Sequence, residues 1–349
     1  MMADILSFAA ALVAALTFTP GARHLAFSVG LVDLPGPRKV HAAPMPLLGG
    51  LAVYVATLFS ISVFVADEAW SQMLGIFVAA TVALVVGVLD DRGFLHHQIK
   101  LMVAMPLAAT ILIGTGIHSE IFHAIERVPI VALPGPWLDY ALSFVWIVGI
   151  MASFSILDHM DGLCAGVAAV ASAFFFYFAW TSGQVLISSL AAAMLGATLG
   201  FLWWNFNPAR IFLGDGGAMF IGLMMATLAI KVRFPEQPQA TSWMVPVLTL
   251  GAAILDTTLV TLSRSRRGLV PFSSPGKDHI AHRLVSLGLT HRVAVLAVYG
   301  VAAVSGLVAL GVTRVAVPAG LTLGMAAVGL ALLAIVWLER TPYERQVRK

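Results

Sequence analysis

Charged residues are scarce in this chain: Asp, Glu, Lys and Arg make up 11% of its 349 residues, whereas 60% are hydrophobic. A mean hydropathy of +0.94 lies far outside the range of water-soluble globular proteins. Apolar runs of about 20 residues recur along the whole chain, which favours transmembrane helices. Because these runs are continuously apolar rather than alternating, they disfavour a transmembrane β-barrel.

Cysteine is almost absent as well. Cys164 is the single cysteine, so the sequence excludes a disulfide within the chain. The first six residues contain Asp4 but no Lys or Arg, which argues against a secretory signal peptide. We therefore predict that the first apolar run is a retained helix with its N-terminus outside.

The apolar runs predict an all-α, polytopic integral membrane protein with about 10–11 transmembrane helices, in one domain over residues 1–349. Neither an internal repeat nor a separable soluble domain is visible. The candidate spans are 4–20, 47–66, 72–89, 101–117, 138–157, 163–181, 184–204, 211–230, 243–262, 293–312 and 315–337.

The basic residues are unevenly divided between the two sets of loops. Sixteen lie in the loops after spans 1, 3, 5, 7 and 9 or in the C-terminal tail, and four lie on the other side. Positive loops face the cytoplasm, so the larger set and the C-terminus are predicted to be cytoplasmic. This bias explains the net charge of +3, and no nucleic-acid partner is predicted.

Five aspartates lie at span ends on the predicted cytoplasmic side: Asp90, Asp91, Asp158, Asp161 and Asp215. Carboxylates at a membrane boundary are costly and commonly functional. The Asp90-Asp91 pair suits a hard divalent cation such as Mg²⁺. On a helix, Asp158 and Asp161 would share one face. Solvated helix ends are the simpler alternative.

The segment around Asp215 is the densest motif. Asp215 precedes Gly-Gly and a new apolar span, so we predict a helix N-terminus there. Such a terminus attracts anions, and the glycines would let backbone approach a phosphate. Simple N-capping by Asp215 is the alternative.

Cations and imidazoles gather on the same side. His279 and His282 lie in the segment 277–283, near Arg264, Arg266 and Arg267, which favours a phosphate-binding loop. Alternatives are a zinc site and an ordinary positive loop. We expect Asp256 to pair with an arginine of 264–267. Acids for a metal and cations for phosphates together indicate phosphoryl transfer, with a lipid as one substrate.

These motifs resemble those of the polyprenyl-phosphate N-acetylhexosamine-1-phosphate transferase family, which is glycosyltransferase family 4. The matches run in the family's order from Asp33 to about Arg292. They are Arg-Lys-x-His…Pro-x-x-Gly-Gly (38–50), Leu-Asp-Asp-Arg (89–92), Leu-Asp-x-Met-Asp-Gly-Leu (157–163), Asn-x-x-Pro-Ala-x-x-Phe-x-Gly-Asp-x-Gly (205–217) and Asp-His-x-x-His-Arg-Leu (278–284).

The resemblance implies a multi-pass enzyme of the bacterial inner membrane that transfers a sugar-1-phosphate from a UDP-sugar to undecaprenyl phosphate, releasing UMP. This would be the first membrane step of cell-surface glycan synthesis. The cofactor implied is Mg²⁺, with Mn²⁺ in its place as an option. Whether the protein forms a homodimer is left open.

The resemblance also implies roles for individual residues. Asp215 would be the main metal ligand, Asp90 and Asp91 would act at the lipid phosphate, and one of that pair would help hold the metal. The nucleotide site would contain Asp158 and Asp161, with Asn205 and Phe212 holding uracil. His279 and His282 would contact phosphates, while Lys39, His41 and Lys100 would add positive charge; from the basic loop itself, Arg266 and Arg267 are also expected to bind substrate.

Three positions depart from the family pattern: Ser155 replaces a frequent Asn, Ala281 replaces one imidazole, and Phe94 replaces a third acid of some members. The His-Arg-Leu ending resembles the UDP-GlcNAc branch, so GlcNAc-1-phosphate is the preferred group. Alternatives are a phospho-N-acetylmuramoyl-pentapeptide transferase, an ion-coupled transporter with acids near the midplane, and a catalytically silent relative.

Overall fold

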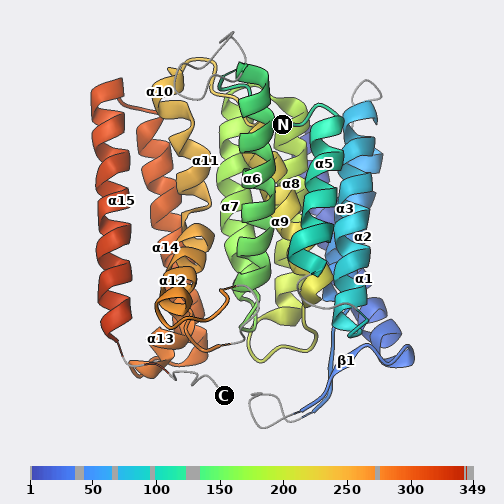
Figure 1. Cartoon of the computed structure of the whole chain (residues 1–349). Helices are drawn as coiled ribbons and strands as arrows, with labels where there is room; N and C mark the ends of the chain where they lie inside the picture. Colours follow the sequence, from blue (N-terminus) through green and yellow to red (C-terminus); the bar gives the residue numbers. More distant parts are fainter. Residues whose placement is uncertain are drawn as a thin grey trace.

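The computed structural model describes residues 2–35, 43–64, 70–94, 99–122, 134–271, 276–341 and 343. Two predicted site residues, Lys39 and His41, lie outside these ranges. The described part consists almost wholly of helices that run alongside one another as a bundle (Figure 1).

The helices are α1 Met2–Ser28, α2 Gly49–Phe64, α3 Trp70–Asp91, the π-helix η2 Lys100–Ala104, α5 Met105–Gly114, α6 Gly135–Leu157, α7 Leu163–Thr181, α8 Val185–Asn205, α9 Gly214–Lys231, α10 Gln239–Ser242, α11 Met244–Thr249, α12 Gly251–Arg266, α13 Ile280–Ser286, α14 His291–Val312 and α15 Val317–Arg340. Two short antiparallel strands, β1 Val32–Asp33 and β2 Met45–Pro46, join α1 to α2.

The prediction of an all-α, multi-pass membrane protein is confirmed. Seven helices of the described part are long and apolar enough to cross a membrane, and the bent pair Gln239–Thr249 and Gly251–Arg266 would make an eighth. The predicted spans 47–66 and 101–117 form the shorter apolar helices Gly49–Phe64 and Lys100–Gly114. The predicted span 243–262 is not one straight helix, because its two parts meet at 73°.

Helix α9 lies in the interior and packs against α2, α3 and α6. Glycines make this close approach possible. A Cβ atom on Gly50 of α2 would lie 2.1 Å from Cα of Gly217, and one on Gly87 of α3 would lie 2.3 Å from Cα of Gly216. The glycines after Asp215 therefore serve helix packing, whereas the sequence suggested that they admit a phosphate. This packing brings the α9 N-terminus to the end of α3.

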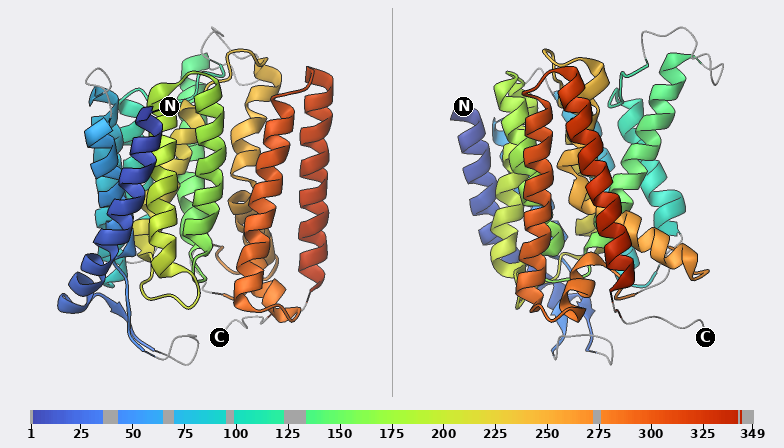
Figure 2. Two further views of the ribbon diagram at one scale, coloured as in Figure 1. Left: turned by 180° about the vertical axis from the view of Figure 1, so that it is seen from behind. Right: turned by 90° about the vertical axis from the view of Figure 1, so that its left-hand side faces the viewer.

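Burial differs across the bundle. In the most apolar stretch of α8, 72% of the residues are buried, against 17% in α15. Helix α15 lies at the edge of the bundle in Figures 1 and 2. Its exposed apolar surface suits contact with lipid, whereas α7, α8 and α9 form the core.

Candidate active site

Acidic residues and one lysine meet where α3 ends and where α9 and η2 begin. The Lys100 Nζ atom lies 3.2 Å from Asp90 Oδ2 and 2.8 Å from Asp215 Oδ1. Both carboxylate oxygens of Asp91 accept hydrogen bonds from the Asp215 backbone N–H, at 3.1 and 2.9 Å. We call Asp90, Asp91, Lys100 and Asp215 the carboxylate cluster. The convergence predicted from the sequence is present, and the Asp215 side chain, at 31% exposure, is more open than that of Asp90, at 9%.

Asp158 and Asp161 do not share a helical face, so that prediction is wrong. Asp158 caps the C-terminus of α6, and Asp161 lies in a turn completed by Gly162, whose φ of +78° only glycine adopts readily. Burial raises the pKa of Asp158 well above its usual value, and the nearby charges of Asp215 and Asp91 raise it further. Asp158 is thus electrostatically part of the carboxylate cluster.

The other polar residues near this turn hold two loops together. Asp161 Oδ2 accepts hydrogen bonds from Asn207 Nδ2 and from the Ala209 N–H, both at 3.0 Å. Asn205 is buried; its Oδ1 accepts from the Gly162 N–H at 3.0 Å and its Nδ2 donates to the Ile211 carbonyl at 2.9 Å. Asp161 and Asn205 therefore fix the α6–α7 turn to the α8–α9 loop.

The backbone of Phe212 ties the same loop to the first hairpin. Its N–H donates to the Pro46 carbonyl at 2.9 Å, and its carbonyl accepts from the Gly49 N–H at 3.0 Å. The loop that leads into Asp215 is therefore held on two sides.

The composition of the carboxylate cluster fits a hard divalent cation. Three carboxylates face one ammonium group, which leaves an excess of negative charge. Oxygen donors are the ligands that Mg²⁺ prefers. Ser155, which replaces the family's frequent Asn, lies beside the cluster, with its Oγ 3.5 Å from Asp215 Oδ1.

A second group of polar residues lies where α12 ends and α13 begins. Arg264 donates to both oxygens of Asp278 at 2.9 and 2.8 Å, and Arg267 donates to the same carboxylate. Burial alone would raise the pKa of Asp278, but the hydrogen bonds and charge of Arg264 lower it to about 2. The expected pairing of Asp256 with these arginines is wrong, because Asp278 occupies them.

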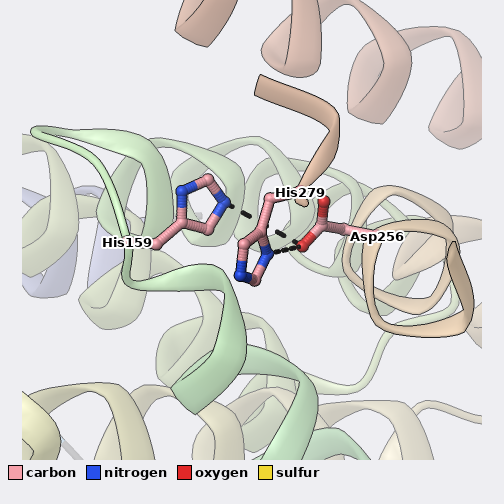
Figure 3. Close-up of side chains that lie close together, drawn as sticks. All are labelled: His159, Asp256 and His279. Carbon is pink, nitrogen blue, oxygen red and sulfur yellow. Dashed lines mark hydrogen bonds and ion pairs between the residues drawn. The ribbon is translucent and has the colours of Figure 1, made fainter. Parts of the chain in front are cut away.

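Asp256 pairs with a histidine instead. Its Oδ2 lies 2.8 Å from His279 Nδ1, and its Oδ1 accepts the Ile280 N–H at 2.7 Å. Figure 3 shows His159 beyond the His279 ring, on the same side of the carboxylate, with Nε2 4.0 Å from Oδ2. The His159 ring centroid lies 3.8 Å from that of His279 and 4.8 Å from that of His282. We call His159, Asp256, His279 and His282 the imidazole cluster.

Our sequence reasoning missed His159 and assigned Asp256 the wrong partner. The available signal was the position of His159 between two aspartates already assigned to the site. Burial lowers the pKa of His282 to about 4, and the neighbouring His279 contributes to this shift. Burial also holds the pKa of His159 well below its usual value. Both rings are therefore neutral at pH 7.

The imidazole cluster is attached to the last helix. Arg283 of α13 is fully buried and donates to the Leu338 carbonyl and to Glu339 Oε1, both at 2.6 Å. Arg266, predicted to bind phosphate, is 68% exposed and lies 3.7 Å from Glu339 Oε2. Its side chain faces solvent at the same end of the bundle as Arg267.

The sequence model of glycosyl transferase family 4 matches residues 73–233. The chain is also 34% identical over 304 residues to a Bacillus subtilis protein named probable undecaprenyl-phosphate N-acetylglucosaminyl 1-phosphate transferase, covering 86% of this chain and 82% of that protein. The chain belongs to glycosyl transferase family 4. The resemblance inferred from the motifs is confirmed.

Two further relatives of this family carry related names. A decaprenyl-phosphate N-acetylglucosaminephosphotransferase from Mycolicibacterium smegmatis is 30% identical over 306 residues, covering 79% of this chain and 74% of that protein. The undecaprenyl-phosphate alpha-N-acetylglucosaminyl 1-phosphate transferase of Escherichia coli is 27% identical over 286 residues, covering 78% and 73%. The family match contains the five aspartates first singled out, whereas His279 and His282 lie beyond it.

Proposed function

We propose that the protein transfers N-acetylglucosamine-1-phosphate from UDP-N-acetylglucosamine to undecaprenyl phosphate, releasing UMP. The carboxylate cluster carries this proposal, because three acids and a lysine at one end of a membrane bundle suit two phosphate substrates. The names of the three relatives support N-acetylglucosamine as the sugar and a polyprenyl phosphate as the acceptor, undecaprenyl phosphate in two of them and decaprenyl phosphate in the third, and they disfavour the muramoyl-pentapeptide alternative.

Asp215 and Asp91 are the residues that would hold Mg²⁺ or Mn²⁺. Asp215 offers a partly exposed carboxylate, and each Asp91 oxygen keeps a lone pair beyond its bond to the α9 backbone. When bound, the ion would neutralise charge on the donor diphosphate.

The remaining members of the cluster would handle the acceptor. Lys100 would hold the oxygens of the lipid phosphate, and its contacts with Asp90 and Asp215 fix its ammonium between the two helix ends. Asp90 would accept the proton of the lipid phosphate as it attacks. Lys39 and His41 would add positive charge from the connector between α1 and α2.

The donor would lie between the two clusters. Asp158 and Asp161 would line the nucleotide site, with Asn205 and Phe212 shaping the loop beside uracil. His279, His282, Arg266 and Arg267 would contact phosphates from the α12–α13 side. Asp161 and Asn205 would act mainly by positioning, because their polar atoms already bond to the protein.

We further propose that both clusters face the cytoplasm at the bacterial plasma membrane. Single cysteines introduced at Arg92 and Lys277 should react with a membrane-impermeant thiol reagent only after the cytoplasmic face is opened. The native Cys164 is buried and gives a low background. Labelling of intact cells at either position would contradict this orientation.

The decisive experiment is a panel of UDP-sugars offered with undecaprenyl phosphate to the detergent-purified protein. We expect UMP release with UDP-N-acetylglucosamine in the presence of Mg²⁺, and none after chelation. Release only with UDP-N-acetylmuramoyl-pentapeptide would establish the alternative transferase. An ion-coupled transporter would release no UMP, and the acids at helix ends rather than midway along the bundle disfavour it.

A further inference from the structure

We propose that His159, Asp256 and His279 form a binding site for a transition-metal ion, with Zn²⁺ as the best-fitting ion. This site is separate from the carboxylate cluster; it shares His279 with the donor contacts proposed above, but its metal binding can be measured without any transferase activity. Figure 3 shows the three side chains converging from three different elements. They come from the α6–α7 turn, helix α12 and the residue before α13.

The potential ligand atoms are close enough to surround one ion. One nitrogen of each histidine and one Asp256 oxygen all lie within 4.8 Å of one another. The oxygen Oδ2 is 2.8 Å from His279 Nδ1 and 4.0 Å from His159 Nε2. Bonds of about 2.0–2.2 Å in a tetrahedral zinc site place ligand atoms about 3.3–3.6 Å apart. One separation falls below this range and the other above it, so the two imidazole rings would have to shift when an ion binds.

His159 provides the first independent argument for a ligand. Both of its ring nitrogens are buried, and neither has a hydrogen-bond partner among the described residues. Buried polar atoms are nearly always paired, and leaving one without a partner is energetically costly. An ion bound by Nε2 would satisfy one of these atoms and account for its orientation toward the carboxylate.

Asp256 provides the second argument. It is only 1% exposed, and no Lys or Arg nitrogen of the described chain lies within 4.0 Å of its carboxylate. Buried carboxylates are usually paired with a cation or bound to a metal. Here the partners are two imidazoles and the Ile280 N–H, and a bound metal cation would place positive charge beside the carboxylate.

The ligand types select the ion. Two imidazoles and one carboxylate suit Zn²⁺, whereas Mg²⁺ takes mainly oxygen ligands. Binding at His279 Nδ1 needs the lone pair of that atom, so the ring would adopt the tautomer protonated at Nε2 and its hydrogen bond with Asp256 would be replaced by bonds from both residues to the ion.

The surroundings are compatible with a cation. Arg264 Nη2 lies 3.4 Å from His279 Nε2, on the nitrogen that would not bind the ion. The charge of Arg264 is already matched by Asp278. The stacked rings of His159 and His279, 3.8 Å apart, would have to open, because lone pairs lie in the ring planes. Binding should therefore separate the rings and fasten α13 to the α6–α7 turn.

The test is metal binding by the full-length protein in detergent. We expect about one Zn²⁺ per chain by mass spectrometry, and Co²⁺ substituted for it should show visible absorption from nitrogen and oxygen ligands. His159→Ala and Asp256→Asn should each lower Zn²⁺ affinity at least about tenfold. His282→Ala is the matched control, because it removes a neighbouring imidazole outside the ligand set and should retain the ion.

Three results would overturn the proposal. One is a purified, folded protein that neither contains Zn²⁺ nor binds added Zn²⁺ or Co²⁺. Another is equal loss of the ion in His282→Ala and His159→Ala. The third is metal-free protein in which His159→Ala only raises KM for the UDP-sugar, which would assign His159 to the donor. If Asp256→Asn fails to fold, His159→Ala alone decides, and retention of the ion in that variant refutes the site.

Discussion

The carboxylate cluster and the imidazole cluster lie at the same end of the bundle but are built in different ways. The first joins helix ends directly: Lys100 bridges Asp90 and Asp215, and Asp91 caps α9. The second is held by a framework around it, in which Asp278 binds two arginines and Arg283 reaches α15. Close packing of glycines positions the first cluster, whereas buried ion pairs position the second.

This difference predicts whether a substitution in each cluster mainly affects activity or stability. The carboxylate cluster is carried by α3 and α9, whose backbones are in contact at Gly87 and Gly216. Loss of one of its acids should therefore lower catalytic activity without lowering the stability of the fold. The imidazole cluster depends on charges that are buried away from water. Loss of one partner there should therefore reduce stability first.

The largest expected effect is in the carboxylate cluster. Asp215→Asn should reduce Mg²⁺-dependent UMP release by about 10³-fold or more, because a partly exposed carboxylate of the proposed metal site loses its charge. The unfolding temperature should stay near that of the parent protein. Glu236→Gln, at an exposed position, is the control and should retain full activity. Full activity of Asp215→Asn would remove the metal assignment.

The second effect is on stability. Asp278→Asn should destabilise the protein by about 3 kcal/mol, because Arg264 and Arg267 lose the carboxylate that neutralises them. Thermal unfolding in detergent measures this, and limited proteolysis should cut first near α13. An unchanged melting temperature would show that the framework is not held by these ion pairs.

The third effect distinguishes positioning from direct contact. Asn205→Ala leaves the Gly162 N–H and the Ile211 carbonyl without partners, which should cost about 1–3 kcal/mol of stability. Activity should fall through kcat as the two loops separate. A higher KM for the UDP-sugar at unchanged stability would instead indicate that Asn205 contacts uracil.

The last effect is absent at neutral pH and appears only in acid, as a pH dependence of the imidazole cluster. His282 has a pKa of about 4 in the folded protein, below its usual 6.5, so the unfolded chain binds a proton first as the pH falls. Stability from this group is present above pH 6.5 and declines toward pH 4, by at most about 1.4 kcal/mol per pH unit. His282→Gln should reduce this slope between pH 6.5 and 5. An equal slope in the variant would exclude His282 as its source.

The apolar runs were enough to predict the helices, and the bias of basic residues was enough to predict that five aspartates share one end. Long hydrophobic segments leave few alternatives in a membrane, which is why these predictions succeeded. The prediction that Asp158 and Asp161 share one helical face was wrong, because Gly162 turns the chain there instead of continuing a helix.

Partners across the bundle could not be predicted. Nothing in the sequence indicates that Lys100 bridges Asp90 and Asp215, because the pairing depends on how α9 packs against α3. Asp256 lies two helical turns from Arg264 in sequence but faces His279, since Asp278 folds back onto the arginines. Which of the two acids pairs with the arginines is therefore determined by where the fold places Asp278, and the sequence does not show this.

Arg283 ties the imidazole cluster to a helix whose surface is mostly exposed and apolar. A detergent or lipid that tilts or shifts α15 should therefore displace the segment that carries His279 and His282. The chain length of the detergent, or the thickness of the bilayer in a reconstituted vesicle, thus becomes an experimental variable for turnover. Assays of this protein should be compared at matched hydrophobic thickness.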